Sequence, residues 1–518
     1  MRERGAWIGL VAGGVGFSLA LLVGSRGGGY FVVVHDLQWL VPLAVVGIAT
    51  AFAASPLGDG KANTLVWLLI VVLGSIGWNF VVYLGKLGGR VFKLLLPLVH
   101  PTGIDWRVGI FAAGKSFSNA ESGYPPLTLW IGKAFAVVDP SVGYVIQVCL
   151  LVGFAGSCAV LCAQLARAWL PAARESSLGC GIGSSECECP RQSFETWQVG
   201  FLGGLWLTTS YGFMFEIERG QLDLYALAFV LLAVWLLLRR PLLSPWWPSL
   251  ALALAVNVKA YPGVLAVVLL WRYRWRAVVP LLVTNLVLLL SAGPGNVRRF
   301  VVRRAQLETS TFPRGWVNDS SWSLAHTLHD VNSWPSCLWL VFFGSSVLLW
   351  IATLVVVMRR GWSARRAVLV SAACIPVMCT FPSISNDYKL VLLLFPLSIL
   401  AVVTATTRRH GGPLWALLFM AVGSEFFLLA RSSRVIAPSL QGSKFLLIVG
   451  LQVLLLIVGA LEGHMSATRE PPGSAVWRRS AHGADSRQLG EKMGKTPSGE
   501  ASGTDDGRQP AGRRKART

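Results

Sequence analysis

The chain has 518 residues, of which 54% are hydrophobic and only 14% are charged, and its mean hydropathy is +0.58. Because soluble globular domains carry about 25% charged residues, this composition excludes an ordinary soluble enzyme. The formal net charge of +21 would suit nucleic acid, but no zinc finger or basic patch interleaved with aromatic residues supports it, so we expect no nucleic-acid partner.

Apolar stretches long enough to cross the hydrocarbon core as helices recur along the chain. They predict an all-α polytopic membrane protein, a bundle of about 12–13 transmembrane helices. No convincing cleavage site follows the first stretch, which favours a retained helix over a signal peptide. The predicted spans are 6–25, 38–55, 64–84, 141–165, 199–216, 222–239, 277–292, 336–358, 366–383, 389–406, 412–431 and 443–461.

Segment 246–271 does not fit a single span, because arginines at 239–240 precede it and arginines at 272–276 follow it. If both clusters are cytoplasmic, the segment enters and leaves the membrane on the same side. Pro262 removes a helical hydrogen bond and disfavours helix in the residue before it, so two short helices broken at 259–262 are expected. Such irregular backbone must be buried in protein or line a wet cavity.

Arginines in the short loops predict the orientation by the positive-inside pattern. They place the N-terminus in the cytoplasm, in a multi-pass protein of the plasma membrane. The extracytoplasmic loops are then 85–124, 217–222, 293–335, 384–388 and 432–442.

Three regions follow from these patterns. Residues 1–63 form an N-terminal pair of transmembrane helices, and residues 64–464 form the main transmembrane region. Residues 465–518 are rich in Gly, Ser, Arg and Lys without apolar periodicity, which predicts a disordered cytoplasmic tail. Its basic end at 513–517 suits anionic lipid headgroups, and a solvated tail that aids topology explains it equally well.

Nothing in the sequence indicates a metal or a cofactor. Cys180, Cys187 and Cys189 share an inner loop, but their spacing is not a zinc pattern and a fourth ligand is missing. Neither a Walker loop nor a dinucleotide-binding pattern is present. We therefore expect no metal and no cofactor.

The predicted outer loops gather polar side chains beside apolar helices. The first loop holds Asp105, Arg107 and Tyr124, and the second is a dense polar hairpin that contains Gln221 and Asp223. A solvated loop aspartate near a helix start is the alternative reading of Asp105. A hydrophilic turn explains part of the hairpin, although a turn needs fewer charged groups than this one has.

Later segments add cations and a further acid. On a helix, Arg299 and Arg303 share a face, and paired arginines suit a phosphate. An interfacial amphipathic helix explains them as well. Lys259 reaches the same region if segment 246–271 is re-entrant, and an ionisable group at membrane depth is a functional candidate. Asp387 and Tyr388 open the span at 389–406.

The order of these pieces resembles the family 87 GT-C glycosyltransferases over residues 64–406. By this resemblance Asp105 takes the place of the catalytic aspartate, and Gly220, Gln221 and Asp223 take that of a Gly-Gln-x-Asn hairpin. The stretch 259–262 resembles the family's Lys-x-x-Pro. Asp387-Tyr388 stands where many members have His-Tyr, which departs from the family pattern.

The resemblance implies transfer of a sugar, mannose above all, from a polyprenyl-phosphate donor to a lipid or glycan acceptor on the extracytoplasmic side. Asp105 would be the general base of an inverting single displacement. Phosphate is already a good leaving group, and it needs cations more than an acid. Donor-phosphate binding falls to Arg299, Arg303 and Lys259, and substrate binding to Arg107, Tyr124, Gln221, Asp223, Asp387 and Tyr388.

Other functions stay open. A GT-C enzyme could transfer arabinofuranose or glucose instead. A secondary transporter would show symmetry between halves and broken helices in matching positions, whereas the sequence has one broken segment without an obvious counterpart. A non-catalytic scaffold explains the polar clusters least.

Overall fold

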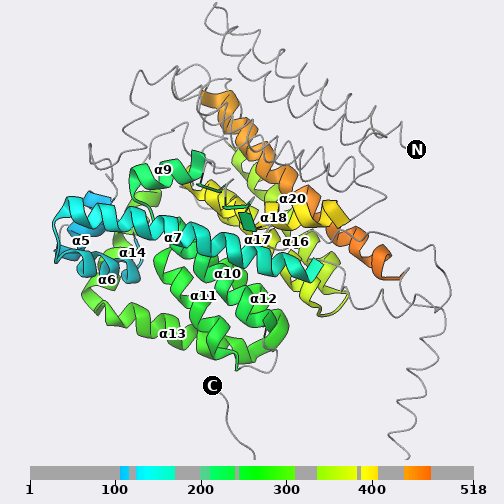
Figure 1. Cartoon of the computed structure of the whole chain (residues 1–518), viewed down its shortest axis with the longest axis horizontal. Helices are drawn as coiled ribbons and strands as arrows, with labels where there is room; N and C mark the ends of the chain where they lie inside the picture. Colours follow the sequence, from blue (N-terminus) through cyan, green and yellow to red (C-terminus); the bar gives the residue numbers. More distant parts are fainter. Residues whose placement is uncertain are drawn as a thin grey trace, which may run out of the picture. The chain divides into compact units, whose positions relative to one another are not determined.

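The computed structural model describes residues 106–115, 124–169, 200–239 apart from 202, 205–206 and 209–210, 244–309, 335–381 apart from 336, 387–406 and 437–467. Every regular element in these ranges is a helix, and no strand occurs among them (Figure 1). By length and composition, three helical stretches could span a membrane, namely Pro140–Trp169, Leu338–Met358 and Tyr261–Ser291, which contains a turn at Arg274. These features confirm the predicted all-α membrane protein.

The elements are η2 (Trp106–Phe111), α5 (Ala112–Lys115), α6 (Pro126–Phe135), α7 (Pro140–Ala166), η4 (Arg167–Trp169), α9 (Tyr211–Arg219), α10 (Asp223–Arg239), α11 (Trp246–Val258), η5 (Tyr261–Leu265), α12 (Ala266–Tyr273), η6 (Arg274–Ala277), α13 (Val278–Ser291), α14 (Pro294–Thr309), α16 (Leu338–Met358), α17 (Ala364–Thr380), η7 (Asp387–Leu393), α18 (Leu394–Thr406) and α20 (Ala437–Ala467). The predicted spans at 6–25, 38–55, 64–84 and 412–431 and the tail after 467 lie outside the described residues.

Several predicted spans coincide with observed helices, and local capping explains where two of them begin. Asp139 accepts the Ser141 N–H at 2.8 Å, and Pro140 occupies the first position of α7. Ser363 likewise accepts the Arg366 N–H at the start of α17. Both helices therefore begin within two residues of the predicted span starts at 141 and 366.

The predicted break in segment 246–271 is confirmed. Helix α11 ends at Val258, and Lys259 has an extended backbone, with φ −145° and ψ 134°. The chain then resumes as η5 and α12. With 13 residues, α11 rises about 20 Å, less than the roughly 30 Å of a bilayer core.

The ends of α11 and α13 fix the direction of this segment. Thr128 on α6 donates to the carbonyl of Val258 at 3.4 Å, and Trp130 on α6 donates to Ser291 at 3.1 Å. The C-terminal ends of α11 and α13 therefore meet the same short helix, and the two helices run in the same direction. Consequently η5 and α12 return between them, and the segment enters and leaves at the same end of the bundle. We call the end at α6 the α6 end.

The arginine-rich loops meet at the other end. Arg365 donates to the carbonyl of Ala168, just past α7, at 2.8 Å. The guanidinium of Arg272, in the last turn of α12, lies 4.9 Å from the centre of the Trp362 ring. We call segments 271–277 and 359–366 the arginine end. The predicted topology requires these loops to share one side, and these contacts meet that requirement.

Helices α10 and α17 lie in the interior of the bundle. Every residue of α17 from Ala367 to Thr380 is buried, and α10 buries most of its length. In contrast, α13 exposes Leu282, Leu286 and Leu290 at helical spacing, which suits a face covered by lipid. Helix α20 accepts hydrogen bonds from Arg360 at Gly459 and Ala460, which precede Glu462, where a second compact unit, Glu462–Thr518, begins.

Candidate functional site

The turn between α9 and α10 is built around Gly220. Gly220 has φ +68°, a left-handed conformation that glycine adopts without steric cost. The N–H of Gln221 donates to the Glu216 carbonyl at 3.0 Å, and the Glu216 side chain accepts the Leu224 N–H at 2.8 Å. Glu216 therefore closes the turn and caps the first turn of α10, which places Gln221 and Asp223 side by side.

The helical conformation extends further into this turn than the sequence predicts. The span was expected to end at 216 and a loop to follow at 217–222, whereas α9 continues to Arg219. The carboxylate of Glu216 is fully buried, and its bond to the Leu224 N–H stabilises this extended helix end. The polar residues of this stretch are thus partly helical.

Gly220 also lies against Trp106. A Cβ atom at position 220 would come within 2.5 Å of the Trp106 Cβ. Trp106 is fully buried and packs edge-on against Phe135 of α6, with 4.6 Å between ring centres. The first predicted outer loop and the hairpin are therefore in direct contact through these two residues.

Replacing Gly220 with alanine should strongly reduce the yield of folded protein. The new methyl group meets the fully buried Trp106, and alanine is strained at φ +68°. Size-exclusion chromatography of detergent-extracted protein, and its thermal midpoint, measure the effect. Gly153→Ala is the matched control, because a Cβ at 153 meets nothing within 4 Å. Equal behaviour of the two variants would contradict the close contact.

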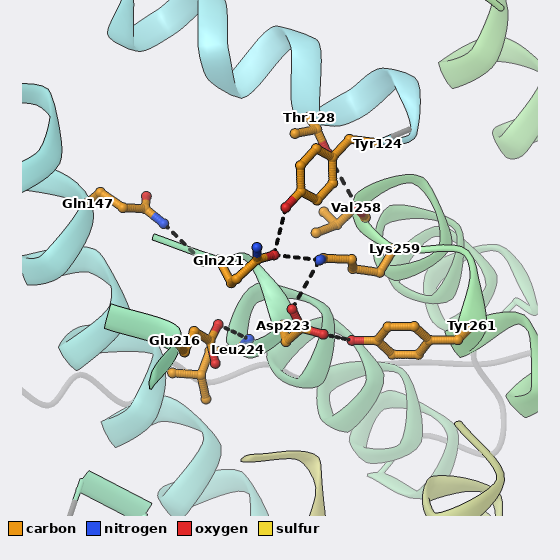
Figure 2. A network of polar contacts seen from close by, with 10 residues as sticks. All are labelled: Tyr124, Thr128, Gln147, Glu216, Gln221, Asp223, Leu224, Val258, Lys259 and Tyr261. Carbon is orange, nitrogen blue, oxygen red and sulfur yellow. Dashed lines mark hydrogen bonds and ion pairs between the residues drawn. The ribbon is translucent and has the colours of Figure 1, made fainter. Parts of the chain in front are cut away.

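Five side chains form a polar network at the α6 end of the bundle: Tyr124, Gln221, Asp223, Lys259 and Tyr261 (Figure 2). Lys259 donates to Gln221 Oε1 at 2.8 Å and pairs with Asp223 Oδ2 at 3.1 Å. The Tyr124 hydroxyl also donates to Gln221 Oε1, at 2.7 Å, and the Lys259 ammonium lies 4.6 Å from the Tyr124 ring centre. Tyr261 donates to Asp223 Oδ1 at 2.5 Å.

The break at Lys259 explains how this network forms. Because α11 ends at Val258, the extended residue 259 turns its side chain toward the α9–α10 turn. Lys259 is 8% exposed and Asp223 is fully buried, so each charge depends on the other for compensation. The network thereby joins three chain segments that are distant in sequence.

Helix α7 supports the turn from the other side. Gln147 donates to the Gln221 carbonyl at 3.3 Å and accepts the Tyr225 hydroxyl at 2.8 Å. Tyr144 donates to the Ile217 carbonyl at 2.6 Å. The turn is therefore held by side chains as well as by its own backbone.

Lys389 brings a second cation to the network. It is 4% exposed, and its ammonium lies 5.0 Å from the centre of the Tyr261 ring. Two buried lysines thus accompany the two buried carboxylates of Asp223 and Glu216. Glu216 Oε2 accepts no hydrogen bond among the described residues.

The structure brings together four of the residues predicted from the sequence: Tyr124, Gln221, Asp223 and Lys259. For the other residues predicted in these loops, the structure gives at most the helix to which they belong. Asp105 lies outside the described residues. Arg107 belongs to η2, and Asp387 and Tyr388 open η7, which packs against α9 and α10.

The paired arginines lie on α14, as the predicted helical spacing requires. Arg299 is exposed and Arg303 is half-buried. Helix α14 starts just after Ser291, at the α6 end, and contacts α6 and α13.

The sequence placed Glu216, Tyr261 and Lys389 within predicted polar stretches but assigned them no role, and it did not indicate Gln147 at all. A glutamine inside the apolar span 141–165 was the available signal for Gln147, since buried amides require partners. Lys389 follows directly after the predicted pair 387–388. Within the part of the chain that the structure describes, no three His, Cys, Asp or Glu side chains gather as a metal ion would need.

Chemically, the α6 end combines a buried ion pair, a second buried ammonium and two tyrosine hydroxyls. Ammonium groups and hydroxyls in such a poorly solvated place bind anionic and hydroxyl-bearing ligands strongly. The family model for glycosyltransferase family 87 matches residues 123–383, which include the whole polar network. No curated protein and no solved structure matches the chain.

Proposed function

The chain belongs to glycosyltransferase family 87, and from this premise we propose that this membrane glycosyltransferase transfers mannose from a polyprenyl phosphate to a lipid or glycan acceptor. The observation that carries the proposal is the family match over the helices whose ends form the polar network. We place this transfer on the extracytoplasmic side of the membrane. Nucleotide sugars are absent from that side, so the sugar donor has to be anchored in the membrane. A polyprenyl phosphate places its sugar at the headgroup level, where the ends of the helices lie.

The proposed reaction is a single inverting displacement. The acceptor hydroxyl oxygen bonds to the anomeric carbon while the bond from that carbon to the phosphate oxygen breaks. The phosphate leaves with the electron pair, and Asp105 accepts the hydroxyl proton. Asp105 directly precedes Trp106 in the sequence, and Trp106 packs on Gly220. This packing supports a base close to the hairpin.

Cations would stabilise the departing phosphate. Lys259 and the arginines of α14 are the candidates predicted from the sequence, and Lys389 joins them because it lies beside Tyr261. A fixed positive charge near developing negative charge lowers the barrier most in a water-poor site. The tyrosine and amide groups of Tyr124, Gln221 and Tyr261 could then orient sugar hydroxyls.

Transfer by the purified full-length protein in lipid nanodiscs tests this function. Synthetic polyprenyl phosphates carrying mannose, glucose or arabinofuranose are supplied with a lipid extract as acceptor, and labelled products are counted. We expect mannose transfer from the lipid-linked donor and none from a nucleotide-linked mannose. Preference for another sugar would retain the reaction class but change the donor. Sugar uptake into vesicles without any glycosylated product would instead indicate a transporter.

Replacing both Arg299 and Arg303 with glutamine should raise the apparent Michaelis constant for the donor far more than that for the acceptor. The reason is that paired guanidinium groups on one helix face suit the donor's phosphate. Initial-rate kinetics with each substrate varied in turn measure the two constants. An unchanged donor constant would favour the alternative that α14 is an amphipathic helix at the membrane surface. Lys133→Gln, an exposed cation on α6, is the control.

A further inference from the structure

The arginine end, opposite the polar network, is strongly and uniformly basic. Segments 271–277 and 359–366 contain seven arginines and no carboxylate. Two ring contacts join the segments: Arg272 lies over the Trp362 ring, and the Trp271 and Trp362 rings meet edge to face with 4.9 Å between centres. The two loops therefore form one surface.

Part of this charge holds the bundle together. Arg360 donates to the carbonyls of Gly459 and Ala460 in α20, at 2.8 and 3.3 Å. Arg365 donates to the Ala168 carbonyl after α7, and Arg366 donates to the Arg360 carbonyl. The carbonyls of Ala168 and Arg360 lie just past the ends of α7 and α16, where arginine commonly binds, whereas Arg360 reaches carbonyls inside α20.

The remaining arginines are turned outward. Arg274, Arg276 and Arg359 are exposed, and no ion pair between described residues uses them. Arg274 has φ 53° and ψ −140°, the only positive φ outside glycine among the described residues. A long basic side chain thus occupies a position where glycine would be less strained.

Exposed tryptophans accompany these arginines. Trp275, between Arg274 and Arg276, is 70% exposed. Trp246 and Trp247, at the start of α11 and so at the end of that helix away from α6, are 48% and 55% exposed. Indole rings of this kind gather at membrane interfaces, where the ring is covered by lipid and the N–H reaches the headgroups. The arginine end therefore has the composition of a surface at headgroup depth.

We propose that the arginine end binds the phosphates of anionic phospholipids in the leaflet that it faces. The fork of N–H donors on a guanidinium matches a phosphate oxygen pair, and a basic cluster at the end of transmembrane helices attracts anionic lipid. The tryptophan rings would lie against the glycerol and upper acyl region of the same lipids. This proposal is independent of the reaction at the α6 end.

Native mass spectrometry of the full-length protein in detergent tests the site. The protein is titrated with an equal mixture of phosphatidylglycerol and phosphatidylcholine, and bound lipids are counted. We expect the wild type to prefer phosphatidylglycerol. The double variant R274G/R276Q should weaken that binding roughly 30-fold, because each arginine near an anionic surface contributes about a fivefold factor. Glycine at 274 accepts the observed φ, so this variant keeps the turn.

The control variant K133Q/R298Q removes the same number of positive charges from exposed positions on α6 and α14, and it should keep the preference for phosphatidylglycerol. Equal binding of both lipids by the wild type would overturn the proposal. So would an unchanged preference in R274G/R276Q, or an equal loss in the control. Inorganic phosphate is added in a parallel arm: displacement of the bound lipid at low phosphate concentration would make the surface a site for soluble anions and would also overturn the proposal.

Discussion

Replacing Asp105 with asparagine should lower sugar transfer by a factor of about 10²–10⁴, while expression and donor binding stay near those of the wild type. Asparagine keeps the shape of the side chain but cannot take the acceptor's proton. The expectation rests on the proposed function and on Trp106, the next residue, which packs on Gly220 beside the polar network. Transfer from a synthetic polyprenyl-phosphate sugar in nanodiscs measures the rate.

Two further variants test whether Asp105 is the catalytic base or only a charged residue in its loop. Asp223→Asn weakens the bond to Lys259, so it should affect stability as well as rate. Asp387→Asn changes an acid at the start of η7. Wild-type turnover in Asp105→Asn would discard the assignment, and a collapse of transfer in Asp387→Asn alone would move the base to that residue.

Replacing Lys259 with methionine should destabilise the protein by about 3–5 kcal/mol, because it leaves the buried carboxylate of Asp223 without a partner. That loss is a large part of the total stability of a typical domain, about 5–15 kcal/mol. It should appear as a lower thermal midpoint in detergent and as less monodisperse protein after extraction. Lys133→Met, which changes an exposed lysine on α6, should stay within about 0.5 kcal/mol of the wild type.

The double variant Lys259→Met/Asp223→Leu tests the reason for the loss. An apolar pair in place of a buried ion pair is often neutral in stability, so the double variant should recover much of the lost midpoint. Under the proposed function its rate of sugar transfer should stay well below that of the wild type, because Lys259, one of the cations proposed for the donor phosphate, is missing. If Lys259→Met alone were as stable as the wild type, the ion pair would not be the buried, interdependent contact described above.

The parts of the fold that the sequence predicted are those with local causes. Pro262 and the flanking arginines predicted the break at Lys259, and the apolar stretch 141–165 predicted α7. The spacing of the α14 arginines predicted their shared helix face. Each of these signals lies in the same stretch of sequence as the feature that it predicts, so a single sequence is enough to find it.

Local signals of this kind do not predict the contacts within the candidate site. Nothing near Lys259 in the sequence indicates that it pairs with Asp223, or that Lys389 lies over the ring of Tyr261. Gln147 supports the turn at Gln221 from a helix 74 residues earlier. These contacts depend on how α7, α10, α11 and η7 pack, and helix packing is decided by side chains far apart in the chain.

Lys259 and Tyr261 follow Asp223 in the chain, so during synthesis Asp223 is made before its partners. Tyr261 follows its partner Asp223 by 38 residues, which a ribosome needs about 2–8 s to add at roughly 5–20 residues per second. During that interval the start of α10 carries a carboxylate whose partners do not yet exist. A carboxylate is costly inside a bilayer, so Asp223 should stay hydrated until Lys259 and Tyr261 arrive. Helices α10 and α11 should therefore settle into the membrane as one hairpin, and a ribosome stalled between them should leave α10 open to extraction or degradation.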